Sequence, residues 1–117
     1  MAKENNWQNE VTLLINTCDA YEDLWMPFFT LLKKYFSPLH MRILLNTETK
    51  NFHFDGLQIE TVHSSAKSYG ARMRDALNHV DTEYVLLMLD DFFLRRPVEI
   101  GRLADIVSWM DADKDIV

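Results

Sequence analysis

Two adjacent carboxylates at the end of an apolar run are the residues best suited to chemistry in this sequence. The run Tyr84–Leu89 is uninterrupted and leads directly into Asp90 and Asp91. Neighbouring carboxylates repel, and holding both near apolar residues costs free energy unless a cation or a hydrogen-bond donor compensates. Mg²⁺ or Mn²⁺ carrying substrate phosphates is the usual compensation, because hard cations bind carboxylate oxygens. The pair therefore predicts a metal site, and the other interpretation is that these acids only open a loop.

The elements that must position this pair follow from the apolar pattern. A run such as Tyr84–Leu89 is typical of a central strand that is buried on both faces of a parallel sheet. In open α/β sheets, ligands bind beyond the carboxyl ends of such strands. The sequence predicts further strands at Val11–Ile15, Met41–Leu45 and Leu57–Val62, with the beginning of another at Asp115–Val117. It predicts helices from Tyr21 or Asp23 to Ser37, from Ser64–Ser68 to Val80, and from Arg95–Pro97 onward with Pro97 at the first helical position.

The order of these elements predicts the fold class. Alternating strands and helices indicate an α/β protein with a mainly parallel sheet and right-handed crossovers, that is, three α/β/α layers. At 117 residues the chain is expected to form a single domain over residues 1–117. The pattern stops where another strand begins, so we expect a truncated fold or a fragment of a longer polypeptide. The exposed sheet edge of an incomplete sheet favours a homo-oligomer or a partner chain.

Composition narrows the classes of function. A net charge of −6 argues against nucleic-acid binding, which needs a basic surface. Cys18 is the only cysteine, so no internal disulfide can form and a reducing compartment is expected. No apolar run approaches the roughly 20 residues that a membrane span needs. We therefore expect a cytoplasmic protein, with a peripheral position on the inner membrane face as the alternative. The histidines have no metal-ligand spacing, which argues against a zinc site.

Four segments together resemble a known family. They are VTLLINTCDAYEDLW, MRILLNTE, SYGARMRDAL and YVLLMLDDFFL, and they span most of residues 10–97. In order and spacing they resemble the N-terminal, nucleotide-binding half of a GT-A glycosyltransferase, of the family 2-like kind found in bacterial polysaccharide and lipopolysaccharide synthesis. The last segment looks like the acidic DxD-type motif of that family, although it reads Asp-Asp-Phe here. The resemblance implies a nucleotide-sugar donor and a saccharide or lipid-linked acceptor.

The resemblance also implies roles for individual residues. Asp91 would bind the Mn²⁺ or Mg²⁺ ion that bridges the diphosphate, and Asp90 would contact the ribose, the ion or its water shell. The ion would neutralise the leaving diphosphate. The other implied nucleotide-binding residues are Thr17, Asp19, Asn46, Glu48 and Arg72. The catalytic base is expected beyond residue 117.

Each of these roles has a simpler alternative. Asp19 could cap the first helix or the turn before it, and Asn46 and Glu48 could only solvate a loop. Arg72 and Arg74 are two positions apart and point to different faces of a helix, so at least one is expected to be a surface charge. Cys18 is read as a small buried residue, because it has no evident base.

Three other classes of protein are alternatives to a glycosyltransferase. A non-catalytic GT-A-like fragment would use the same fold to bind a partner or to assemble. A receiver-like signalling domain fits poorly, because its adjacent acids follow the first strand. A nucleotidyltransferase would carry a glycine-rich basic loop after the first strand, and NTCDAYED contains neither glycine nor a basic residue.

Overall fold

The protein is an α/β domain built on a parallel sheet. The computed structural model describes residues 7–113. The strands are β1 (Val11–Asn16), β2 (Arg42–Thr47), β3 (Ile59–His63) and β4 (Tyr84–Met88). The α-helices are α2 (Glu22–Tyr35), α3 (Tyr69–Leu77) and α4 (Ile100–Ala112), and short 3-10 helices η1 (Trp7–Glu10) and η2 (Asp19–Tyr21) flank β1. The predicted α/β class is therefore confirmed.

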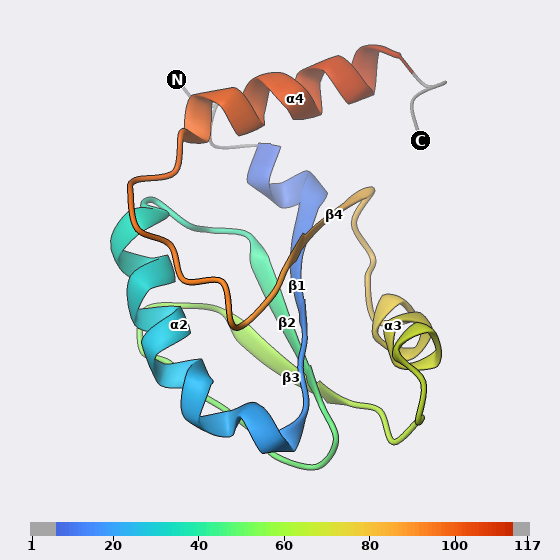
Figure 1. Cartoon of the computed structure of the whole chain (residues 1–117). Helices are drawn as coiled ribbons and strands as arrows, with labels where there is room; N and C mark the ends of the chain where they lie inside the picture. The colour runs from blue at the N-terminus through green and yellow to red at the C-terminus, as the bar shows by residue number, and fades with distance from the viewer. Residues whose placement is uncertain (1–6, 114–117) are drawn as a thin grey trace.

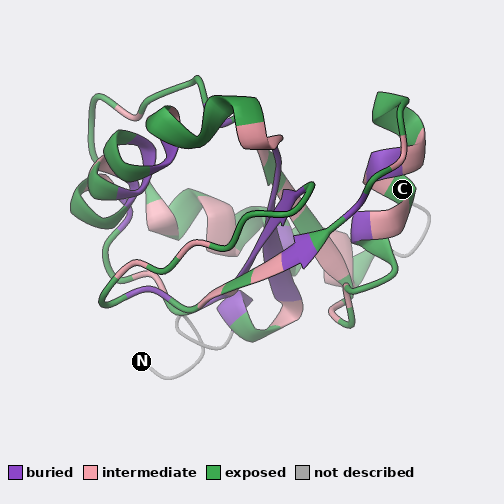
Figure 2. Ribbon diagram, turned by 90° about the horizontal axis from the view of Figure 1, so that it is seen from below, coloured by how far each residue is buried: buried purple, intermediate pink, exposed green. Residues whose placement is uncertain are grey.

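All pairings in the described sheet are parallel, and the strand order is β3-β2-β1-β4. β1 lies between β2 and β4, and all six of its residues are buried. Figure 2 shows the buried residues gathered in the central strands. Because the strands are parallel, their carboxyl ends lie at the same end of the sheet, where the chain must place its polar turns.

Helices cover both faces of the sheet, which is compatible with the three predicted layers. α2 and α3 lie on opposite sides, and α4 crosses the end where the strands begin (Figure 1). The larger core cluster joins the sheet to α2 and to Val107 of α4 and includes Trp25 and Phe29, whereas a smaller cluster under α3 contains Leu14, Leu44 and Ala76. In the part of the chain described, no helix is long and apolar enough to cross a membrane.

Local sequence explains where two of the helices begin and end. α2 has Glu22 and Asp23 in its first turn and Lys33 and Lys34 in its last, which complements the helix dipole at both ends. α3 begins after Ser68, whose hydroxyl accepts a hydrogen bond from the Ala71 amide at 3.1 Å. This N-cap satisfies one of the free amides of the first turn.

The prediction that Tyr84–Leu89 forms a central strand is wrong for the sheet formed within residues 7–113, because β4 lies at the end of its strand order. Its burial alternates, and Val85 and Leu87 remain 39% and 46% exposed. An apolar run indicates side chains that favour burial, but it does not reveal whether a neighbouring strand is present. The two central positions belong to β1 and β2.

The start predicted for the last helix is also wrong. α4 begins at Ile100, three residues beyond Pro97. The preceding segment is held to the end of α2, because the Val98 amide donates to the Tyr35 carbonyl oxygen at 2.7 Å. Tertiary hydrogen bonding therefore replaces the helical start that Pro97 favoured. The strand expected at Asp115–Val117 lies outside the described residues.

Candidate functional site

A cavity of about 760 Å³ opens at the carboxyl end of the sheet. Its wall combines residues that follow all four strands, so distant parts of the sequence meet there. This volume lies within the roughly 300–1,000 Å³ range of small-molecule pockets. The lining residues are Asn16, Thr17, Cys18, Tyr21, Glu48, Ser65, Ala66, Lys67, Tyr69, Arg72, Leu89, Asp90 and Asp91.

Thr17 holds the first carboxylate of the acidic pair. Asp90 is only 6% exposed, and its Oδ2 atom accepts a hydrogen bond from the Thr17 hydroxyl. The same hydroxyl accepts a hydrogen bond from Trp25 Nε1 at 3.1 Å. The buried indole thus fixes the threonine, and the threonine fixes Asp90. Asp91 is exposed at the cavity and has no hydrogen-bond partner in the described part of the chain.

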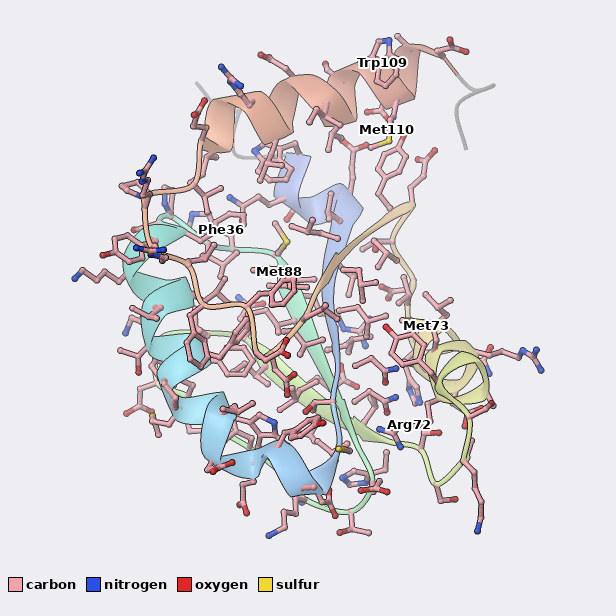
Figure 3. All side chains as sticks on the ribbon, viewed as in Figure 1. Phe36, Arg72, Met73, Met88, Trp109 and Met110 are labelled. Carbon is pink, nitrogen blue, oxygen red and sulfur yellow. The ribbon has the colours of Figure 1, made fainter. Side chains whose placement is uncertain are left out.

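Arg72 joins three strand ends through its guanidinium group. The side chain extends from α3 toward the sheet (Figure 3) and is 9% exposed. It donates hydrogen bonds to the main-chain oxygens of Thr17 and Ser64 and, at 3.4 Å, to that of Asn46. No salt bridge joins Arg72 to a carboxylate within residues 7–113. Hydrogen bonds from a charged donor compensate its burial, so Arg72 is a structural link as well as a cavity residue.

Asn46 lies behind the cavity wall rather than in it. The residue is fully buried, and its Nδ2 atom donates to Asn16 Oδ1 at 2.7 Å and to the Arg72 carbonyl oxygen at 3.2 Å. Its Oδ1 atom is buried without a partner in the described part of the chain. The side chain therefore supports Arg72 from below and does not reach a ligand in this conformation.

Asp19 connects the loop after β1 to the loop after β2. Its carboxylate accepts hydrogen bonds from the Thr49 hydroxyl at 2.6 Å and from the amides of Glu48, Thr49 and Lys50 at 3.2–3.3 Å. These bonds, led by the Thr49 hydroxyl, lower the pKa of Asp19 from 3.8 to about 2. In return, Glu48 Oε1 accepts a hydrogen bond from the Asp19 amide at 3.1 Å. Asp19 is thus engaged with the protein and is not part of the cavity lining.

The predicted site residues divide into two groups. The structure brings Thr17, Glu48, Arg72, Asp90 and Asp91 together around the cavity. Asp19 and Asn46 lie next to these residues and hold the wall in place. The interpretation of Cys18 as a buried residue is wrong, because it is partly exposed and lines the cavity.

Sequence reasoning missed part of the site. Lys67 and Tyr21 line the cavity, and so does Tyr69, which is 56% exposed. The available signal was position, because residues 65–69 follow a strand end just as Thr17 and Asp90 do. Lys67 adds a second positive charge to a lining that also carries Arg72, so the cavity presents both acidic and basic groups to a ligand.

The donor set at the acidic pair fits a hard divalent cation. Asp91 offers an exposed carboxylate, and Asp90 lies beside it with one oxygen bound by Thr17. Carboxylate oxygens are preferred ligands of Mg²⁺ and Mn²⁺, which keep several water ligands and bind substrate phosphates. Asp91 would hold such an ion directly, and Asp90 would contact it or its water shell.

A second acidic group lies elsewhere, and we assign it no function. Carboxylate oxygens of Glu10, Glu83 and Asp111 lie within 4.8 Å of one another. The Tyr84 hydroxyl donates to Asp111 at 2.6 Å, and this bond raises the pKa of Tyr84. Acidic groups of this kind are common without an ion, and these residues have other interactions in the protein.

Comparison with known proteins does not assign the chain to a family. No family model matches it, and no curated protein matches its sequence. Its function must therefore be argued from the cavity and the side chains that line it.

Proposed function

We propose that this chain is the donor-binding part of a metal-dependent glycosyltransferase with a GT-A-like fold. The observation that carries the proposal is the cavity at the strand ends, where an acidic pair and two cationic side chains meet. The donor would be a nucleotide-activated sugar, and the sugar would pass to a hydroxyl of a saccharide or lipid-linked acceptor. Bacterial surface polysaccharide synthesis, in the cytoplasm or at the inner membrane face, is the corresponding setting.

Charge distribution supports a metal–diphosphate ligand over either component alone. Asp90, Asp91 and Glu48 repel a free diphosphate, so a divalent cation is needed to reverse the local field. Lys67 and Arg72, which also line the cavity, would then attract the phosphate oxygens. The bound ion would supply electrostatic stabilisation of the leaving diphosphate.

The protein's own residues would orient the donor. Thr17 holds Asp90 in place, and the Trp25 indole limits the rotation of the threonine hydroxyl. The Asp19–Glu48 connection sets the separation of the loops after β1 and β2, where the nucleoside would lie. Such preorganisation reduces the ordering cost of binding.

A thermal-shift titration tests the proposal. The chain is heated with UDP, GDP, CMP or dTDP, each with and without MnCl₂. A ligand that binds only the native state at 100 times its Kd adds about 2.7 kcal/mol of stability. We expect a shift in midpoint that requires Mn²⁺ and is specific to one nucleotide.

The variants Asp91→Asn and Asp55→Asn separate a site effect from a general charge effect. Asp55 is an exposed acid whose side chain is 98% exposed, and it lies outside the cavity lining. The shift should disappear in Asp91→Asn and persist in Asp55→Asn. A folded chain that responds to none of the nucleotides would overturn the proposal.

A non-catalytic GT-A-like module is the second candidate, and it is favoured by the position of β4 at the end of the strand order within residues 7–113. Such a module would bind a partner or assemble without turning over a donor. It differs from the first candidate in predicting no metal-dependent nucleotide shift.

A further inference from the structure

The loop between β4 and α4 combines exposed aromatic and basic side chains. Phe92 and Phe93 are 66% and 39% exposed, and the value for Phe92 is the highest among the exposed large apolar residues of the described chain. Arg95 and Arg96 follow them closely and are exposed as well. We name these four side chains the aromatic–basic loop. Exposed apolar groups beside charged ones mark sites of interaction with a protein or a membrane.

The core holds this loop in place on either side of the two arginines. Leu94 and Val98 pack against the larger core cluster. The Val98 amide also donates to the Tyr35 carbonyl oxygen at 2.7 Å, and the segment runs past the C-terminal end of α2 (Figure 1). The aromatic rings are therefore exposed on an anchored segment, which lowers the ordering cost of binding a partner.

The cations of this region have no carboxylate partner within residues 7–113. Arg95 and Arg96 form no salt bridge there, and neither does Lys34, which is exposed in the last turn of α2. All three lie within a few residues of the hydrogen bond between Tyr35 and Val98. In a chain with a net charge of −6, such a local excess of positive charge attracts an anionic partner.

A hollow of about 540 Å³ lies in the same loop and is lined by residues 93–98. Phe93, Arg95 and Arg96 are among the lining residues, so apolar and cationic groups face the same space. No acidic residue of the described chain lines this hollow, and the next acid, Glu99, pairs with Arg102 at 2.7 Å. It differs in this respect from the cavity at the strand ends, where acids and cations are mixed.

We propose that the aromatic–basic loop binds the surface of an anionic phospholipid bilayer. The rings of Phe92 and Phe93 would enter the boundary between headgroups and acyl chains. Arg95 and Arg96 would donate hydrogen bonds to lipid phosphates, and Lys34 would add attraction to the negative surface.

A bilayer suits this loop better than an acidic protein segment or a free phosphate. Either of these would use the arginines but would leave the Phe92 ring in water. A bilayer offers both environments in layers, with anionic headgroups outside and hydrocarbon beneath them. The remaining acids of the protein are repelled by such a surface, so binding should require this one orientation and weaken as salt is added.

The proposed contact lies next to the cavity but does not rest on the proposed donor site. Phe92 follows Asp91, which lines the cavity, so a bilayer at the loop would bring lipid-linked molecules near the acidic pair. Vesicle binding is measured without nucleotide or Mn²⁺. Either proposal can therefore fail without the other.

Co-sedimentation with vesicles tests the proposal. The unmodified chain is mixed with vesicles of phosphatidylcholine alone, or of phosphatidylcholine and phosphatidylglycerol in equal parts. We expect binding to the anionic vesicles to be tighter by about tenfold or more and to decrease with added salt.

Matched variants locate the contact. Phe92→Ser and the double variant Arg95→Gln/Arg96→Gln should each weaken binding to the anionic vesicles by about tenfold or more. Trp109→Ser removes a side chain of similar exposure from α4, and Arg74→Gln removes an exposed cation from α3. These two controls should bind as the unmodified chain does. Thermal unfolding verifies that all four variants are folded.

Four outcomes would overturn the proposal. A folded chain that binds neither kind of vesicle would contradict it directly. Equal binding to neutral and anionic vesicles would contradict the role of the cations. Unchanged binding by Phe92→Ser or by the double arginine variant would place the contact elsewhere. Binding of polyglutamate without binding of vesicles would show that the loop accepts an acidic protein segment instead of a membrane.

Discussion

Two loops at the same end of the sheet differ in how many hydrogen bonds the protein donates to their carboxylates. After β1, Asp19 accepts four hydrogen bonds from residues 48–50. After β4, Asp90 accepts one from Thr17, and Asp91 accepts none in the described part of the chain. A carboxylate whose oxygens accept hydrogen bonds from several protein donors holds neighbouring loops together. A carboxylate with unused oxygens beside a cavity remains able to bind a cation.

Removing Arg72 should have the largest effect, because its guanidinium group joins the ends of β1, β2 and β3. Arg72→Met leaves three main-chain oxygens without their charged donor and should lower the free energy of unfolding by about 3 kcal/mol. Urea unfolding measures this loss. Arg74→Met on the exposed side of α3 is the matched control and should cost less than about 0.5 kcal/mol. Equal losses in the two variants would contradict the linking role of Arg72.

Changing Thr17 removes the hydrogen bond to Asp90 in the loop after β4 and does not remove the hydrogen bonds to Asp19. Thr17→Val removes the donor to Asp90 and the acceptor of Trp25 Nε1, so two buried polar groups lose a partner. We expect a loss of about 2 kcal/mol in urea unfolding. Thr30→Val, at an exposed position of α2, should cost about 0.5 kcal/mol or less. A Thr17→Val chain as stable as the unchanged protein would mean that Asp90 does not depend on the threonine.

Lowering the pH should remove the stability that the Asp19 carboxylate contributes, because the pKa of Asp19 is lowered in the folded protein. The hydrogen bonds from Thr49 and the neighbouring amides lower the pKa of Asp19 from 3.8 to about 2. Between these two pH values, Asp19 therefore binds a proton more readily in the unfolded chain than in the folded protein. The stabilisation from Asp19 is fully present above pH 3.8 and is lost as the pH falls toward 2.

A comparison of thermal midpoints checks this pH dependence. The unchanged protein should exceed Asp19→Asn by a constant margin above pH 4, and the margin should shrink as the pH falls through 3.8 toward 2. A margin that stays constant over this window would show that the Asp19 carboxylate does not gain from its donors.

Asp91 should contribute least to stability. Its carboxylate is exposed and has no protein partner in the region described, so Asp91→Asn should change the free energy of unfolding by less than about 0.5 kcal/mol. Removing one of two neighbouring acids also relieves repulsion, which favours a small gain over a loss. A loss of several kcal/mol in urea unfolding would show that Asp91 is structural, as Asp19 is.

Much of the fold could be predicted because it depends on local apolar patterns. The runs VTLLI and MRILL became buried strands, and the helix predicted from Tyr21 or Asp23 to Ser37 matches α2, Glu22–Tyr35, within two residues. The position of β4 could not be predicted in the same way. Edge and central strands share the same residue preferences, and what lies beside a strand is set by distant segments.

The site could be predicted in part for a geometric reason. Parallel strands place their carboxyl ends together, which brought Thr17, Arg72 and Asp90 to one cavity. Lys67 and Tyr21 were missed because residues between the regular elements show no repeating apolar pattern in the sequence. The burial of Asn46 was missed because side-chain amides pair across strands, through Asn16 in this protein, and such pairing leaves no sequence signal.

The central claim is that the acids after β4, and not the acid after β1, bind a divalent cation. Electron paramagnetic resonance of Mn²⁺ measures this directly, because the signal of the free ion decreases on binding. With the nucleoside diphosphate that gives the largest thermal shift present, we expect the chain and its Asp19→Asn variant to reduce the free-ion signal. Asp91→Asn should weaken Mn²⁺ binding by about 100-fold or more, beyond the 10–100-fold typical of outer-shell changes. Equal Mn²⁺ binding by Asp91→Asn and the unchanged protein would contradict the claim.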